Sequence, residues 1–304
     1  MSAFAESSLI FPFHPLNPLT FWREDKMNTI HWLENPDCHD AALVGGKAAN
    51  LGRLAATHPV PPGFCFTPKK PGPRGLSPDL YDELVAAYAA LAARCGTPEV
   101  RVAVRSSAVD EDGRQTSFAG LHDTYLNVTG PGAVAAAVRR CLASAQTPRA
   151  QSYRRALGLP EEADVAVLVQ QLVVADVSAV VFSADPTTGA RDRVVINATW
   201  GLGESLVGGT VTPDLYVVRK YDLEILSRQI AEKTCMTVAT PDGTREVPVP
   251  GCMQREPALD NAQIRALADL ARTLENSQGW PVDLECAYQK GRLYLLQCRP
   301  ITTV

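Results

Sequence analysis

The chain has 304 residues, of which 46% are hydrophobic and 20% are charged, as in an ordinary globular protein that buries a core. Its formal net charge of -4 gives no reason to expect nucleic acid or an anionic membrane as a partner. Charges or prolines interrupt every apolar run, which excludes a membrane-spanning helix. Any basic residues that bind phosphate must therefore act locally.

Neither the N-terminus nor the cysteines indicate secretion. Residues 1–26 lack a basic start followed by an apolar core, which excludes a secretory signal. We expect these residues to form a loose tail, with Met27 as an alternative translation start. The eight cysteines are scattered without any C-x-x-C spacing, so we expect reduced, buried thiols in a cytoplasmic protein instead of zinc ligands or disulfides.

Helical and extended patterns alternate along the chain, which indicates α/β or α+β architecture. The helix expected at 77–94 has Ser77 as its N-cap and acidic residues in its first turn. The stretch 232–256 is rich in turn residues, and its pattern does not determine an element. The other expected elements, in chain order, are a strand at 29–33, a helix at 45–56 entered through a glycine pair, a short strand after the prolines of 59–67, a strand at 100–105 followed by a polar loop to 123, a helix at 132–145, apolar strands of a buried sheet at 165–174, 178–183 and 194–198, and an amphipathic helix at 260–278.

The last part of the chain reads as a β-hairpin whose strands cover 282–288 and 293–298, joined by a turn centred on Gly291. With a three-residue loop, Glu285 lies opposite Gln297 and Asp283 opposite Arg299, with their Cβ atoms about 5 Å apart. A carboxylate beside an amide oxygen suits a hard divalent cation, and a guanidinium two residues along suits phosphate. The hairpin therefore predicts a site for a nucleoside triphosphate with magnesium.

Two glycine-rich segments resemble phosphate-binding motifs but lack essential residues. Residues 45–47 (Gly-Gly-Lys) resemble the end of a P-loop, yet Ala41 stands in place of the first glycine and Ala48 in place of the magnesium-binding Ser or Thr. Residues 201–206 lack the third glycine of a dinucleotide fingerprint. Both motifs are rejected, and Lys47 taken alone is also typical of a solvated lysine at a helix start.

Arg105 ends the expected strand at 100–105 and opens a loop rich in small and polar residues. A planar guanidinium at that place is suited to grip phosphate, and the loop segment Ser117-Phe-Ala-Gly120 can bring backbone N–H groups close to an anion. The alternative is an ordinary ion pair between Arg105 and Glu111 or Asp112. The sequence of this loop alone leaves both interpretations open.

A collinear series of motifs from about residue 28 onward resembles the nucleotide-binding part of the phosphoenolpyruvate synthase, pyruvate phosphate dikinase and rifampicin phosphotransferase family. The motifs are Ala42-Leu-Val-Gly-Gly-Lys-Ala-Ala-Asn-Leu-Gly52, Val60-Pro-Pro-Gly-Phe64, Val102-Ala-Val-Arg-Ser-Ser-Ala108, Ser117-Phe-Ala-Gly-Leu-His-Asp-Thr-Tyr-Leu-Asn-Val128, Ser183-Ala-Asp-Pro-Thr-Thr-Gly189, Trp200-Gly-Leu-Gly-Glu204, Val211-Thr-Pro-Asp214 and Gln297-Cys-Arg-Pro-Ile-Thr302. The resemblance implies an ATP-grasp fold of the α/β (α+β) class, with ATP held between a subdomain at 27–166 and another at 167–304.

The resemblance also implies roles for individual residues toward ATP and Mg2+. Phosphate contacts fall to three basic residues, which would also be the catalytic ones, and the magnesium ligands to the hairpin pair. By motif position, the implied set is Lys47, Arg105 and Arg299 on the phosphates, Gly120 and Thr124 in the loop over the transferred phosphoryl group, Gln170 and Val173 in the strand at the adenine, and Glu285 and Gln297 on magnesium. This set suits in-line positioning and charge neutralisation, which phosphoryl transfer needs most.

Departures from the family pattern leave the charged set intact. Ala179, Leu172, Cys286 and Cys298 replace residues of other types that the family favours, and none of these changes removes a charged ligand. The pair Leu121-His122, where glutamines are frequent, falls in the loop over the phosphates and is placed to alter the acceptor or the rate. A catalytic base at His122 and a histidine without special role are the two interpretations.

Full-length members of the family carry a swivelling phosphohistidine domain and a further acceptor domain, which this chain does not include. Its five histidines lie in no segment that resembles the family's phosphohistidine motif. Three hypotheses follow. The chain phosphorylates a histidine on a separate phosphohistidine-domain protein, splitting ATP towards AMP; it is a self-sufficient ATP-grasp kinase or ligase acting on a small molecule; or it binds ATP without catalysis.

Overall fold

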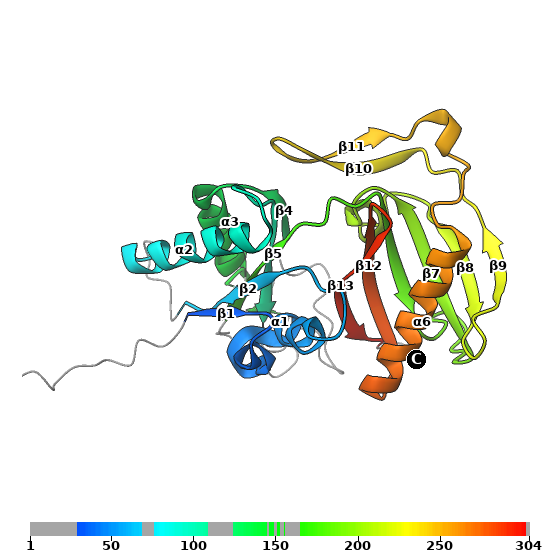
Figure 1. Cartoon of the computed structure of the whole chain (residues 1–304), viewed down its shortest axis with the longest axis horizontal. Coiled ribbons are helices and arrows are strands. Elements are labelled where there is room, and N and C mark those ends of the chain that lie inside the picture. Colours follow the sequence, from blue (N-terminus) through cyan, green and yellow to red (C-terminus); the bar gives the residue numbers. More distant parts are fainter. Residues whose placement is uncertain are drawn as a thin grey trace, which may run out of the picture.

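The computed structural model describes residues 29–68, 76–108, 124–144, 146–148, 151–152, 155 and 165–301. Its two large sheets are antiparallel, and each has its own helices (Figure 1). The tail expected at residues 1–26 lies outside this part of the chain. The division into subdomains at 166/167 stays a prediction, although the structure pairs the strand that crosses this point entirely within the first sheet.

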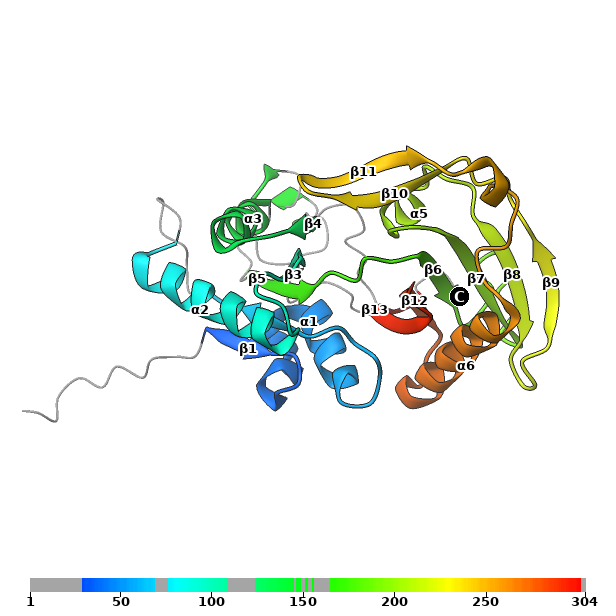
Figure 2. The same ribbon diagram turned by 45° about the horizontal axis from the view of Figure 1, so that its top comes forward.

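The first sheet has five strands in the order β1-β2-β5-β3-β4. Helices α2 and α3 cover one of its faces and α1 the other (Figures 1 and 2). The elements are β1 (Ile30–Trp32), η1 (Pro36–His39), α1 (Ala41–Ala55), β2 (Gly63–Phe66), α2 (Pro78–Arg94), β3 (Val102–Ala108), β4 (Thr124–Val128), α3 (Pro131–Ser144) and β5 (Val165–Gln171).

The central strand β5 explains why the apolar run at 165–171 has no polar alternation. Val167 and Val169 pack against α2 and α3, whereas Ala166 and Leu168 pack against α1 on the opposite face. Successive side chains of a strand point to opposite faces, so a strand with helices on both sides is apolar throughout. The run therefore marks the middle of a three-layer arrangement.

The second sheet has six strands in the order β13-β12-β6-β7-β8-β9, and a separate two-stranded sheet pairs β10 with β11. The elements are β6 (Val177–Phe182), β7 (Arg193–Trp200), α5 (Glu204–Val207), β8 (Asp214–Arg219), β9 (Ile225–Gln229), β10 (Cys235–Thr240), β11 (Gly243–Pro248), η2 (Gly251–Met253), α6 (Asn261–Gln278), β12 (Val282–Gln289) and β13 (Arg292–Pro300).

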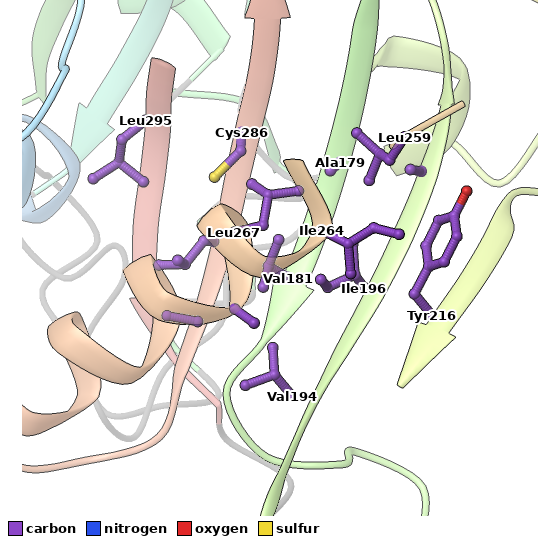
Figure 3. Close-up of a cluster of buried hydrophobic side chains, with 14 of the residues drawn as sticks. Ala179, Val181, Val194, Ile196, Tyr216, Leu259, Ile264, Leu267, Cys286 and Leu295 are labelled. Atoms are coloured by element: carbon purple, nitrogen blue, oxygen red, sulfur yellow. The ribbon is translucent and has the colours of Figure 1, made fainter. Parts of the chain in front are cut away.

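Helix α6 covers one face of the six-stranded sheet and leaves the other face toward the first sheet. Its Ile264 and Leu267 lie over Val181 and Ile196 of the sheet (Figure 3). The helix begins at a capping box in which the Asp260 side chain accepts from the backbone of Gln263 and the Gln263 side chain accepts from Asp260. Burial of this apolar stripe fixes the helix on the sheet.

The expected helices agree with the structure to within a few residues, including Ser77 as the N-cap of α2. Two expectations about the strands were wrong. Strand β3 continues to Ala108, so the polar loop does not begin at Ser106. The three apolar segments from 165 to 198 belong to two sheets instead of one. The stretch 232–256, which the sequence pattern left undetermined, contains the β10–β11 hairpin.

The cysteines of the described ranges are all free thiols. Burial raises the pKa of Cys38 to about 12, and it raises that of Cys65 well above its ordinary value. These two thiols stay protonated at neutral pH, as structural cysteines do. Among the described helices, none has both the length and the apolar character that a membrane crossing requires.

Candidate functional site

A cavity of about 340 Å³ lies between the two sheets, a size at the lower end of small-molecule sites. The first sheet contributes residues of β3, β4 and β5 to its wall, together with α1, and the second contributes β6, α5, β12 and β13. Seven of the residues singled out from the sequence line this cavity: Lys47, Arg105, Thr124, Gln170, Val173, Glu285 and Gln297. Gly120 lies outside the described residues, and Arg299 is not among the lining residues.

Lys47 reaches the cavity because α1 docks very closely on β3. Gly45 has φ +78 and breaks the helix into two, and a Cβ on it would lie 2.2 Å from the carbonyl oxygen of Ser107. Only glycine fits both the backbone conformation and the space. The Ser107 hydroxyl donates to Val44 O at 2.8 Å and accepts from Ala48 N at 3.1 Å, which fixes the helix after the break.

The Lys47 side chain is 8% exposed, and its Nζ donates to the carbonyl oxygen of Ser106 at 3.3 Å. A lysine this buried is not the solvated residue that its position at a helix start also suggested. The ammonium group lies on the cavity wall, where it presents a point charge to whatever enters.

Arg105 lies inside β3, where it pairs with Leu168 of β5 and Thr124 of β4, and not at the strand end expected from the sequence. One terminal nitrogen donates to Leu296 O of β13 at 3.2 Å, which joins the first sheet to the second. Its Nε is buried and has no hydrogen-bond acceptor in the described part of the chain. A half-buried guanidinium on a cavity wall is suited to bind an anion. The alternative partners Glu111 and Asp112 lie outside the described residues.

The C-terminal hairpin places Glu285 opposite Gln297 and Asp283 opposite Arg299, so the predicted register is confirmed. The predicted three-residue loop was wrong. Gln289 pairs with Arg292, which leaves a two-residue turn. A β-bulge at Glu285/Cys286 shifts the register by one residue, so the pairs beyond it are those a three-residue loop would also have given.

The bulge also changes which side chains of β13 face the cavity. Leu295 and Cys298 pack into the core under α6, whereas the two successive residues Leu296 and Gln297 both line the cavity. Strict alternation would have sent one of these two residues to the core. The bulge thus gives β13 both a carbonyl oxygen for Arg105 and an amide side chain beside Glu285.

Asp283 and Arg299 form an ion pair one step along the hairpin, with 2.8 Å between Arg299 Nε and Asp283 Oδ2. Burial raises the pKa of Asp283 above its ordinary value, against the lowering effect of the Arg299 guanidinium. The second oxygen, Oδ1, is buried and accepts no hydrogen bond in the described part of the chain. The pair adds a carboxylate and a cation to the same strands as Glu285 and Gln297.

The rest of the cavity wall is mostly apolar and comes from both sheets. Gln170 is 2% exposed, and its side chain donates to Pro61 O at 3.0 Å. It lines the cavity together with Val173, which follows it closely in the chain. Leu202, Leu206 and Val207, on and before α5, face the cavity as well. Sequence reasoning assigned no role to these residues, although the glycine-rich run before α5 was the signal that could have indicated them.

The donors at the hairpin fit a divalent cation that is shared with a ligand. Among the described residues, no group of three or more His, Cys, Asp or Glu side chains is placed to hold a metal by itself. Magnesium is usually bound by one or two carboxylates together with substrate phosphates and waters. One carboxylate and one amide oxygen, with Lys47 and Arg105 on the same cavity, match that kind of site.

Residues 74–304 match the family model described as "Pyruvate phosphate dikinase, AMP/ATP-binding domain". The chain belongs to this family. The predicted fold class, mixed α and β of the ATP-grasp type, is thereby confirmed, and the chain is an ATP-binding domain by descent.

Relatives of known name are much longer than this chain. It is 38% identical to a "Probable phosphoenolpyruvate synthase" of Methanocaldococcus jannaschii, over 92% of this chain and 27% of the relative. It is 37% identical to a "Rifampicin phosphotransferase" of Streptomyces sviceus, over 90% of this chain and 36% of the relative. Among solved structures, PH1788 from Pyrococcus horikoshii matches with a TM-score of 0.42 and 16% identity, over 83% of this chain and 87% of that one.

Proposed function

We propose that this chain is an ATP- and magnesium-dependent phosphotransferase module that phosphorylates a histidine on a separate phosphohistidine domain. The observation that carries the proposal is that four residues line the same cavity. Lys47 and Arg105 come from the side of the first sheet, and Glu285 and Gln297 come from the second sheet. Two cations and a carboxylate–amide pair around one cavity suit a metal-bound triphosphate. Membership of a family of AMP/ATP-binding domains indicates ATP as the nucleotide.

The two parts of the cavity suit the two parts of ATP. The apolar wall formed by Val173, Leu202 and Leu206 suits a flat base, with Gln170 beneath it holding the strand in place. The Lys47 ammonium and the Arg105 guanidinium bind phosphate oxygens at the other part of the cavity. Thr124, at the start of β4, lies beside the transferred phosphoryl group.

Glu285 and Gln297 would hold magnesium, which when bound neutralises charge on the phosphates. Each comes from a separate strand, and the backbone pairing of β12 with β13 fixes the two side chains next to each other. Asp283 keeps Arg299 in position beside them through its ion pair. We propose Arg299 as a phosphate contact once ligand is present.

The protein's part in the reaction is to position and neutralise, because phosphoryl transfer needs little covalent help. Lys47 and Arg105 are held in place before ligand arrives, by Ser106 O and Leu296 O respectively. Donors fixed in this way need no reorganisation when charge builds up on the phosphoryl oxygens. A mechanism with these residues requires an acceptor in line with the phosphoryl group and leaves the acceptor's identity to another domain.

We propose a histidine on another domain as that acceptor because the chain spans only 27% and 36% of the two named relatives. None of the five histidines of the chain lies in a phosphohistidine-like motif. Among the described residues, His31 is enclosed by Asp37 and Thr67 and is absent from the cavity wall. Transfer of the β,γ-diphosphate of ATP to a histidine of a partner domain, which leaves AMP, is therefore favoured over self-phosphorylation. Hydrolysis of the diphosphohistidine by water then leaves phosphohistidine and releases inorganic phosphate.

The test measures nucleotide products after the purified chain is mixed with ATP and Mg2+, with and without a phosphohistidine-domain protein. We expect AMP only when that protein is present, and a rate roughly 100-fold lower for Glu285→Gln because it removes the charged metal ligand. Glu256→Gln, at an exposed position, serves as the matched control and should keep the wild-type rate.

Three outcomes would contradict the proposal. Wild-type AMP formation by Glu285→Gln would remove the metal site from the mechanism. Product formation that depends on a small molecule instead of the phosphohistidine domain would favour a self-sufficient kinase or ligase. Tight ATP binding without product under any condition would leave a non-catalytic nucleotide-binding protein.

A further inference from the structure

The β10–β11 hairpin extends from the six-stranded side of the molecule to β4 of the five-stranded sheet (Figures 1 and 2). It forms a two-stranded sheet of its own, with Thr240 and Gly243 as the closing pair of its turn. None of its residues lines the cavity. Its contacts with neighbouring elements, however, fall on residues that do, or on their immediate neighbours in the chain.

The base of the hairpin holds the α5 wall of the cavity. Leu202 N donates to Thr237 O at 2.8 Å, and Gly201, with φ +77, leaves no room for a Cβ, which would lie 2.4 Å from the same oxygen. The Thr244 hydroxyl donates to Glu204 Oε2 at 2.7 Å. Both Leu202 and Glu204 line the cavity, so this wall is positioned by the hairpin.

The tip of the hairpin is held by one side chain of the opposite wall. Asn127 of β4 donates from Nδ2 to Thr240 O and to Gly243 O, each at 2.5 Å, and its Oδ1 accepts from Arg101 at 2.9 Å. The amide can take only this orientation, because guanidinium groups only donate and carbonyl oxygens only accept. Its neighbour Leu126 lines the cavity.

Asn127 is suited to this contact by its backbone as well as by its amide. Its φ of +57 lies in the left-handed region, which asparagine adopts more readily than other non-glycine residues. The side chain is buried, with the residue 5% exposed, so its three hydrogen bonds are shielded from water. Both donor hydrogens of this buried amide bond to one hairpin turn, so the side chain positions the hairpin and does not contact the cavity.

We propose that Asn127 latches the β10–β11 hairpin as a strap between the two walls of the cavity, and that the latched strap sets how tightly nucleotide is held. The series of contacts runs from Asn127 through the hairpin to Leu202 and Glu204. Releasing the tip frees the α5 wall to move away from β4, so a nucleotide that contacts both walls loses contacts. Asn127 is a positioning residue in this scheme and touches no substrate.

This inference rests on the proposed nucleotide site, so its test has one readout that needs no nucleotide. Asn127→Asp keeps the shape, the left-handed backbone and the acceptor for Arg101, but replaces both donors toward Thr240 and Gly243 by an oxygen. Asn127→Gly fits the same backbone and removes the side chain, in case the carboxylate disturbs folding. Asp242→Asn, exposed at the hairpin tip, is the matched control.

Titration calorimetry with AMP-PNP and Mg2+, in the absence of the phosphohistidine-domain protein, gives the first readout. Loss of two hydrogen bonds predicts a dissociation constant about tenfold higher for both Asn127 variants. Hydrogen exchange of the ligand-free protein gives the second, and amides of 235–248 and 201–204 should exchange faster in these variants. Asp242→Asn should match the wild type in both.

Unchanged affinity together with unchanged exchange in both Asn127 variants would overturn the latch. Faster exchange with wild-type affinity would overturn its role in holding nucleotide. If the wild type binds no AMP-PNP, the proposed function fails, and exchange alone then decides whether the latch exists.

Discussion

Arg105 links the two sheets at the level of a single residue. It lies in the interior of β3, donates to Leu296 O across the cavity and keeps a buried Nε unused. We predict that Arg105→Ala lowers kcat/KM for ATP. The loss should correspond to about 2–4 kcal/mol of transition-state stabilisation, because a preorganised charged donor is lost. Arg105→Lys should recover only part of this, since an ammonium cannot replace the planar fork.

Steady-state kinetics with the phosphohistidine-domain protein measures these values. Arg255→Ala is the matched control, because that arginine's side chain is 79% exposed and pairs with Glu232 at the surface. Equal kinetics for Arg105→Ala and Arg255→Ala would show that Arg105 has a purely structural role.

Gly45 is a second single residue on which the site depends, because it lets α1 approach β3. Gly45→Ala should lower the free energy of unfolding by about 1–3 kcal/mol more than Gly96→Ala, because overpacking adds to the strain of a positive φ. Gly96 has φ +66 but nothing within 4 Å of an added Cβ, so it isolates the backbone term. Urea denaturation of the two variants measures the difference, and equal losses would show that the close approach costs nothing.

At the scale of elements, local signals were predictable and long-range ones were not. Ser77 and Asp260 begin their helices as predicted, because an N-cap needs only residues within one turn. The pairing of Glu285 with Gln297 was predictable because a hairpin is also local. The bulge was not predictable from the sequence of the hairpin. It puts Leu296 on the cavity side, where its carbonyl oxygen accepts from Arg105, and Arg105 lies on a strand far away in sequence.

The turn of the C-terminal hairpin carries its own prediction. Lys290 and Gly291 have φ +51 and +77, as a two-residue type I′ turn requires, and asparagine is preferred over lysine at the first position. Lys290→Asn should raise the free energy of unfolding by about 0.5 kcal/mol, in the range of surface substitutions. Gln289→Asn, outside the turn centre, should not. A loss of stability for Lys290→Asn, measured by denaturant titration, would contradict this turn assignment.

At the scale of the molecule, the sequence did not reveal where the chain crosses from one sheet to the other. Strand β5 ends at Gln171 and β6 begins at Val177, so five residues separate strands of different sheets. Leu172 N donates to Arg101 O and Asp176 N to Tyr288 O, which anchors the crossing to one sheet at each end. Both strands are apolar, and no pattern within them says which sheet each joins. The α5 wall and the β10–β11 strap were not predicted either, because their positions also depend on contacts between segments that are distant in sequence.

Ligand binding should stabilise the whole molecule because the site draws on both sheets. Besides the Arg105 contact, the C-terminal hairpin is joined to the segment between α1 and β2, where Leu295 N donates to Pro59 O at 3.0 Å. At a concentration 100 times the dissociation constant, Mg·AMP-PNP should add about 2.7 kcal/mol to the free energy of unfolding and raise Tm accordingly. Calorimetric melts should show a smaller rise without Mg2+, and Glu285→Gln should lose this dependence on the metal. A rise that is equal with and without Mg2+ would contradict the hairpin metal site.

The most direct measurement is a crystal structure of the chain with AMP-PNP and Mn2+, which replaces Mg2+ and is located by its anomalous scattering. We predict one manganese peak within coordination distance of both Glu285 and Gln297, with the phosphates contacted by Lys47 and Arg105. Nucleotide bound in another place, or manganese that touches neither hairpin residue, would contradict this prediction.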